Sequence, residues 1–331
     1  MRTIAAKLAQ AIALILAVIV LNFFLIQIAP GDVVDALAGG PDGAGEASAE
    51  VNERLREAYG LDKPVLAQLG IYIGNVAQGD LGESFVFNKP VTSLISDRIW
   101  PTILLAFTAL AFAILLGTFI GTVAARKPES PFSAGITVFA LVGFAMPAFW
   151  TGILLLLLFS VQLEWLPVSG MNDVRLSRDA GWFERQIDTV EHLILPAISL
   201  GIIYLASYAR LSRASMLEVL ESDYVRTARS KGLGERSVMF KHALRNGIIP
   251  IITVMGLQFG AVVSGAILVE TVFAWPGIGR LAFDSVNRRD TNVLLGILLL
   301  LSATVIIANI VTDLLYRVAD PRIRVGGEDR G

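Results

Sequence analysis

The 331-residue chain has no cysteine and only two histidines, His192 and His242. Without thiols it cannot form a disulfide, a thiolate metal site or a thiol redox centre, and two distant histidines do not make a metal cluster. The motifs G-x-S-x-G of α/β-hydrolases and H-E-x-x-H of zinc metalloproteases are also absent from the sequence, so neither enzyme class is indicated. We therefore expect no catalytic residue, no metal and no cofactor bound by this chain.

Charge is also scarce. Only 17% of the residues are charged and 54% are hydrophobic, whereas soluble proteins carry about 25% charged residues. The apolar residues form long uncharged runs, and a membrane-spanning helix needs about 20 of them. Buried helices of a large soluble protein would not give so many runs of this length. We predict an all-α integral membrane protein with six transmembrane helices, over 8–29, 99–125, 132–163, 193–209, 247–269 and 291–312.

The basic residues are distributed unevenly between the segments that connect these spans. With the N-terminus inside, the cytoplasmic segments hold 16 of the 27 Lys and Arg residues, although the outer segments are longer. Positive charge accumulates on the cytoplasmic side of membrane proteins. We therefore predict an N-in/C-in topology, with the multi-pass chain in a bacterial inner membrane. The net charge of −2 gives no indication of nucleic-acid binding.

The spans divide the chain into three parts. Residues 1–98 are expected to hold the first transmembrane helix and a structured outer loop, 99–316 a five-helix core, and 317–331 a cytoplasmic tail. In the loop, we expect a charged helix over 49–59. A second helix, with one apolar face, is expected to start near Pro64. That face either packs on the spanning helices or lies on the membrane surface.

Small and polar residues inside the spans suggest how the bundle packs and works. Gly117 and Gly121, like Gly256 and Gly260, predict close helix contacts, because small residues allow two backbones to approach. Pro147 predicts a kink, either purely structural or a joint for alternating access. The candidates for the translocation path or gate are Pro147, Gln258, Glu270, Trp275 and Asn309.

Each of these candidates has a plainer alternative. Gln258 and Asn309 are uncharged polar residues inside spans, which hydrogen-bond between helices or line a cavity. Glu270 lies at the outer end of the fifth span, as a gate charge or as an ordinary interfacial carboxylate. Arg280 and two further arginines follow near Trp275; they are solvated loop charge, or they meet an acidic lobe of a binding protein or a substrate carboxylate.

The segment 210–246, between the fourth and fifth spans, has the most informative pattern. A short helix can begin at Glu221 or Ser222, with cations in its C-terminal half where the helix dipole favours them. Gly232 supplies the positive φ that ends a helix, and a second helix is expected from Glu235 onward. A helix of two or three turns is marginally stable alone, so a docking role is indicated.

This segment resembles the cytoplasmic EAA loop of ATP-binding-cassette importer permeases. Ala228 and Gly232 have the spacing of that motif, although Arg226 and Thr227 replace its first Glu and Ala. The blocks 223–233 and 242–246 are similar to the peptide and nickel branch of the family. Other short matches follow in order along the chain, at 30–32, 59–64, 79–82, 146–150, 270–273, 275–279 and 320–322.

The resemblance implies a type I importer permease fold whose short cytoplasmic helix enters a cleft of an ATPase subunit. Ala228 is expected to face that cleft, where only a small side chain fits. The resemblance also implies a second, homologous permease subunit, two ATPase subunits and an extracytoplasmic substrate-binding protein. The coupling residues would be Asp223, Tyr224, Arg226, Thr227, Ala228, Lys231, Gly232, Leu233, His242 and Arg245.

The sequence lacks the features of two rival classes, an ion-driven transporter or channel and a membrane enzyme. The sequence has no G-x-x-x-x-G-K-[ST] phosphate loop, so ATP would be hydrolysed by partner subunits and this chain would not be an enzyme. An ion-driven secondary transporter or channel would show intramembrane carboxylates or inverted repeats, and we find neither in the sequence. A membrane enzyme would show a reactive cluster, which the sequence also lacks. Within the branch, dipeptides, oligopeptides, glutathione-like or opine-like compounds and nickel chelates all remain open as substrates.

Overall fold

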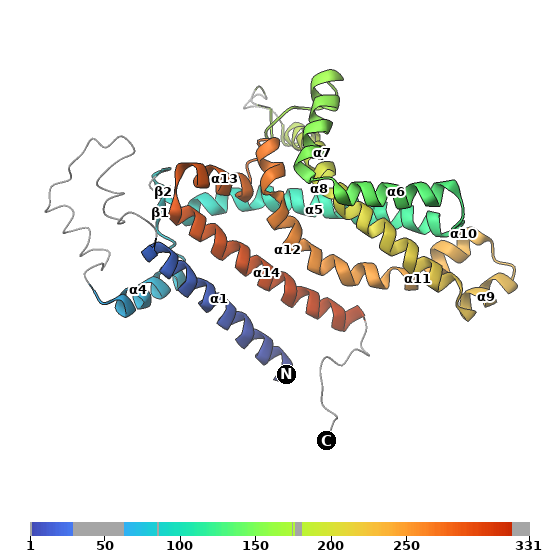
Figure 1. Ribbon diagram of the computed structural model, residues 1–331, viewed down its shortest axis with the longest axis horizontal. Coiled ribbons are helices and arrows are strands. Elements are labelled where there is room, and N and C mark those ends of the chain that lie inside the picture. The colour runs from blue at the N-terminus through green and yellow to red at the C-terminus, as the bar shows by residue number, and fades with distance from the viewer. Residues whose placement is uncertain (1, 29–62, 85, 174, 176–180, 320–331) are drawn as a thin grey trace. The chain divides into compact units, whose positions relative to one another are not determined.

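The computed structural model describes residues 2–28, 63–84, 86–173, 175 and 181–319 (Figure 1). The charged helix expected over 49–59 and most of the tail 317–331 lie outside these residues. The chain divides into two compact units, one of 1–99 with 281–306 and one of 100–280 with 307–331. Each unit is described by itself.

The first unit combines the N-terminal helix with the segments 63–99 and 281–306. Helix α4 begins directly after Pro64, as predicted. Asn22 of α1 donates to the Leu295 carbonyl of α14 at 3.0 Å, and Ser84 donates to Asp290. The unit comprises α1 (Arg2–Ile28), α4 (Val65–Ala77), the two-residue antiparallel strands β1 (Glu83–Ser84) and β2 (Lys89–Pro90), the start of α5 (Val91–Ala125), most of α13 (Ile278–Arg288) and the first part of α14 (Thr291–Ala319).

The second unit is a helical bundle in which α8 packs against α6, α7 and α12; Figure 1 shows α6 beside α8. Its elements are the rest of α5, α6 (Pro131–Ala145), α7 (Ala148–Leu155), the π-helix η1 (Leu156–Gln162), α8 (Trp182–Leu220), α9 (Asp223–Ser230), α10 (Glu235–Ser237), the π-helix η2 (Val238–Ala243), α11 (Leu244–Gly247), α12 (Ile249–Val272) and the last part of α14.

Close packing at the predicted glycines is confirmed for one of the two pairs. A Cβ on Gly121 of α5 would lie 2.3 Å from the Ala209 carbonyl of α8, and one on Gly117 would lie 2.8 Å from the Leu205 carbonyl. The two backbones therefore touch along this stripe, as small residues permit.

The chain does bend at Pro147, but the prediction of a kink within one continuous helix is wrong, because the helix is broken there. Helix α6 ends at Ala145, α7 begins at Ala148, and the two meet at 105°. Pro147 lacks an N–H, and a proline also disfavours the helical conformation of the residue before it. Met146 accordingly has an extended ψ of 130°, which breaks the helix completely.

Among the described residues, three helical segments are long and apolar enough to cross a membrane: α5, α8 and Thr291–Ile310 of α14. The bent pair α6–α7 makes a fourth if it counts as one span. Helix α8 is far longer than the uncharged run 193–209, because it continues through charged turns at both ends. Helix α13 forms where the sequence suggested only a charged loop.

Candidate functional site: helix α9 and the α12–α13 turn

The predicted short helix in the segment 210–246 is confirmed. Helix α9 starts after Ser222, whose backbone is extended, and carries Asp223 in its first turn. Gly232 ends the helix with a φ of +76°, and the Leu233 N–H donates to the Ala228 carbonyl at 3.4 Å. A left-handed residue directly after a helix is the usual way to satisfy its last carbonyls.

Helix α9 is held by two small apolar side chains. Val225 is fully buried and Ala228 is 7% exposed. Both belong to an apolar cluster whose other buried members are Ala125, Met216, Val238, Met239 and Ala243. The expectation that Ala228 faces a partner's cleft is therefore wrong: Val225 and Ala228 are three residues apart, so they form the apolar stripe of α9 and must face the chain's own core.

The opposite face of α9 and the turn after it are open and polar. Asp223 and Arg226 form a loose ion pair at 3.8 Å, with side chains 101% and 70% exposed. Tyr224 is also exposed and accepts a hydrogen bond from Asn246 at 2.8 Å. Of the other predicted coupling residues, His242 is half-buried, and the exposed ones are Thr227, Lys231, Gly232, Leu233 and Arg245.

An ion pair not anticipated from the sequence ties α9 to α10. Arg229 donates to both carboxylate oxygens of Glu235, at 2.8 and 3.2 Å. Hydrogen bonding from Arg229 lowers the pKa of the Glu235 carboxyl. Because the pair bridges Gly232, it fixes the direction in which the chain leaves α9.

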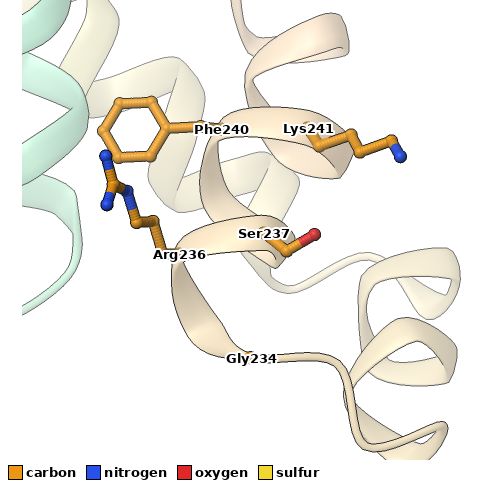
Figure 2. Close-up of a pocket in the computed structure, with 5 residues that line it drawn as sticks. All are labelled: Gly234, Arg236, Ser237, Phe240 and Lys241. Atoms are coloured by element: carbon orange, nitrogen blue, oxygen red, sulfur yellow. The ribbon is translucent and has the colours of Figure 1, made fainter.

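A hollow of about 620 Å³ lies on α10 and η2, which follow α9 in the chain, and is lined by Gly234, Arg236, Ser237, Phe240 and Lys241. In Figure 2, Arg236 lies beside the Phe240 ring while Lys241 extends the opposite way. Phe240 stacks on Phe119 of α5, with ring centroids 6.2 Å apart. Near α9 the chain thus presents a basic and aromatic surface.

Two of the gate candidates meet at the turn between α12 and α13. Glu270 and Trp275 are both fully buried. Thr102 donates to Glu270 at 2.7 Å, and the Trp275 indole donates to the Pro101 carbonyl at 2.9 Å. Neither side chain faces an open path in this structure.

The other gate candidates lie elsewhere. Pro147 is exposed at the start of α7, Gln258 is half-buried in α12, and Asn309 is exposed on α14. Arg280 belongs to the turn and is not a freely solvated charge, because its guanidinium donates to the Ala274 carbonyl at 2.6 Å.

Comparison with known proteins decides the family. The model of the binding-protein-dependent transport system inner membrane component matches residues 117–325. The chain belongs to this family. The di/tripeptide transport system permease protein DppB of Pseudomonas aeruginosa is 44% identical, over 97% of this chain and 98% of that protein. The glutathione transport system permease protein GsiC of Escherichia coli is 42% identical, over 92% and 93%. The resemblance to the peptide branch is thereby confirmed.

Solved structures agree on the fold. The inward-facing MetNI methionine ABC transporter matches with a TM-score of 0.53 at 15% identity, covering 69% of this chain and 96% of the matched chain. An amino acid ABC transporter crystallised with histidines gives a TM-score of 0.51 at 18% identity, covering 69% and 94%. At these identities the match establishes a shared helical architecture.

Proposed function

We propose that this chain is a pore-forming permease subunit of an ATP-driven importer that takes short peptides from an extracytoplasmic binding protein. Family membership and the di/tripeptide, peptide and glutathione relatives support this assignment. Di- and tripeptides are the preferred substrates, because the relative at 44% identity carries that name.

In the proposed topology, six spans place both termini and α9 in the cytoplasm and the α12–α13 turn outside. Helix α1 and α12 supply the two spans beyond the four that length and composition support directly. The excess of Lys and Arg in the segments assigned to the cytoplasm supports this orientation. The membrane would be the bacterial inner membrane.

Partner subunits would complete the importer complex. A second permease would close the translocation path, and two ATPase subunits would each receive one coupling helix. ATP would draw the ATPase pair together, move the coupling helices, and switch the bundle between inward- and outward-facing states by rigid-body rotation. The permease would catalyse no covalent step.

The construction of α9 is the observation that carries the coupling proposal. An apolar pair anchors the helix to its own chain, while Asp223, Arg226 and Thr227 point outward. Anchoring lets a short helix transmit force, because a helix of eight residues would not hold its shape alone. The exposed face is then free for a separate protein.

The test is purification of the tagged permease from native membranes. We expect ATPase subunits in the eluate, and we expect Arg226→Glu to remove them by reversing a charge at the contact. Lys127→Glu, an exposed charge reversal outside α9, should retain them. ATP-dependent uptake of trialanine by proteoliposomes of the native complex completes the test. Uptake driven by an ion gradient without ATP would favour a secondary transporter.

A further inference from the structure

The turn between α12 and α13 is built around one buried carboxylate. The first amides of any helix lack partners within the helix. In α13, the Ile278 N–H donates to the Thr102 hydroxyl at 2.8 Å, and the Arg280 N–H donates to Glu270 at 3.1 Å. The N-terminus of α13 is therefore capped by side chains from two other helices, 176 and 10 residues away in sequence.

The Thr102 hydroxyl links all three helices. It donates to Glu270 of α12 at 2.7 Å and accepts from Ile278 of α13, while its own backbone belongs to α5. Such a doubly used hydroxyl has no apolar substitute, since a side chain of the same shape without the hydroxyl would remove both hydrogen bonds at once.

Two glycines make room for the carboxylate. A Cβ on Gly277 would lie 2.2 Å from one Glu270 oxygen and 2.3 Å from the other, and one on Gly279 would lie 2.5 Å from the Ile267 Cα. The backbone of the turn must approach Glu270 this closely for the cap to form. The Pro-Gly-Ile-Gly sequence of the turn thus has a specific structural reason.

The buried Trp275 fastens the same turn to the adjacent residue of α5. Its indole donates to the carbonyl of Pro101, next to Thr102. The backbone N–H of Trp275 also donates to the backbone carbonyl of Glu270 at 2.8 Å. The turn is therefore attached to α5 at two successive residues, once by a hydroxyl and once by a carbonyl.

We propose that Glu270 and Thr102 are positioning residues for transport, which lock the α12–α13 turn onto α5 and do not contact the substrate. Both Glu270 oxygens are engaged by this chain's own donors, and the side chain is fully buried. The lock ties α12 and the first residues of α13 to α5 at Pro101 and Thr102, all within one compact unit. Its consequence for transport rests on the proposed function; the lock itself does not.

The structural part of the test measures the fluorescence of Trp275 alone. The other four tryptophans are exposed by 45% to 75% and can be replaced, as Trp100→Phe, Trp150→Phe, Trp165→Phe and Trp182→Phe. We expect blue-shifted emission and little quenching by acrylamide in this background. Thr102→Val should red-shift the emission and raise quenching several-fold, while Thr102→Ser should restore both values.

Glu270→Gln should behave like Thr102→Val, because the amide NH₂ would meet donors instead of accepting from them. Glu191→Gln, an exposed carboxylate on α8, is the matched control and should change nothing. Unaltered Trp275 emission in Thr102→Val and Glu270→Gln would overturn the proposal. If these variants do not fold, amide exchange in the unmodified protein decides: slow exchange at Ile278 and Arg280 supports the cap, and exchange as fast as in an exposed loop overturns it.

The transport arm uses trialanine uptake by the native complex. Thr102→Val should lower the maximum rate about ten-fold or more, because both hydrogen bonds of the buried hydroxyl are lost, at an unchanged apparent KM. A raised KM at an unchanged maximum rate would overturn the proposal, since it would indicate substrate contact. If the unmodified complex takes up no peptide, the proposed function fails, and the fluorescence arm still judges the lock.

Discussion

Helix α9 and the α12–α13 turn differ in which side chains they bury. Helix α9 buries two small apolar side chains and leaves its charges outside. The α12–α13 turn buries a carboxylate, an indole and a hydroxyl, and supplies each with a hydrogen-bond partner from the same chain.

This difference distinguishes an exposed charged surface, for which we propose a partner, from a polar site that is closed within the chain. Charges that point outward remain available to another protein, whereas polar groups that are already paired inside the chain have little left to offer a ligand. Of the charged candidates selected from the sequence, the structure leaves Arg226 exposed and Glu270 fully buried, which is why we propose a contact role for Arg226 and a positioning role for Glu270.

The largest effect is expected from Ala228→Glu. It would place an unpaired carboxylate among Met216, Val238 and Met239, which costs about 3 kcal/mol or more. Helix α9 should detach, so that trypsin cleaves the segment 210–246 rapidly and ATPase subunits are lost from the purified complex. Thr227→Glu, one residue away on the exposed face, is the control and should leave the tryptic pattern unchanged.

A smaller effect is expected from Gly121→Ala. The new methyl group would lie 2.3 Å from the Ala209 carbonyl, so α5 and α8 must separate, at a cost of about 2 kcal/mol. Thermal unfolding in detergent measures it. Gly135→Ala on α6 meets nothing within 4 Å and should unfold like the unmodified protein. Equal unfolding temperatures for both variants would contradict the close α5–α8 contact.

Gly232→Ser should cost about 1 kcal/mol, because a residue with a Cβ is strained at positive φ. Space is not the reason, since nothing lies within 4 Å of the added Cβ. Gly234→Ser tests the distinction directly, because Gly234 has an ordinary φ of −60°. Amide exchange in α9 should accelerate in the first variant and not in the second.

The smallest effect concerns pH. Arg229 lowers the pKa of Glu235 below its usual 4.5, so the pair stabilises the fold above that value and its contribution disappears as the pH falls through the lowered pKa. Both side chains are about 40% exposed, which limits the effect to about 0.5 kcal/mol. At pH 7 the amide hydrogens of α9 should exchange faster in Glu235→Gln than in the unmodified protein, and the difference should shrink as the pH falls below 4.5 and disappear once Glu235 is protonated in the folded protein. A difference that persists then would contradict the ion-pair assignment.

Local patterns predicted much of the fold. The helix start after Pro64, helix α9 ended by Gly232 and the contacts of Gly117 and Gly121 each depend on a few neighbouring residues. They could be inferred because conformational preference and side-chain size act over short distances.

Long-range partners could not be predicted in this way. Thr102 lies 168 residues from Glu270, so the sequence showed only a carboxylate near a membrane boundary. We predicted an exposed Ala228 because, in the family motif, the small side chain at this position is expected to enter a partner's cleft. Its spacing from Val225 was the available signal that it faces inward. Helix α13 was missed because its charges resemble those of a loop.

The central claim, that α9 presents its polar face to an ATPase while its apolar pair stays within the permease, can be tested by cysteine accessibility. The chain has no native cysteine, so Arg226→Cys and Ala228→Cys each give a single site in inside-out membrane vesicles. A maleimide that does not cross membranes should label position 226 when the permease is expressed alone. Co-assembly with the ATPase subunits should protect that site, and position 228 should remain unlabelled in both states. Labelling of position 228 in the free permease and its protection in the complex would contradict the account, because Ala228 would then face the partner.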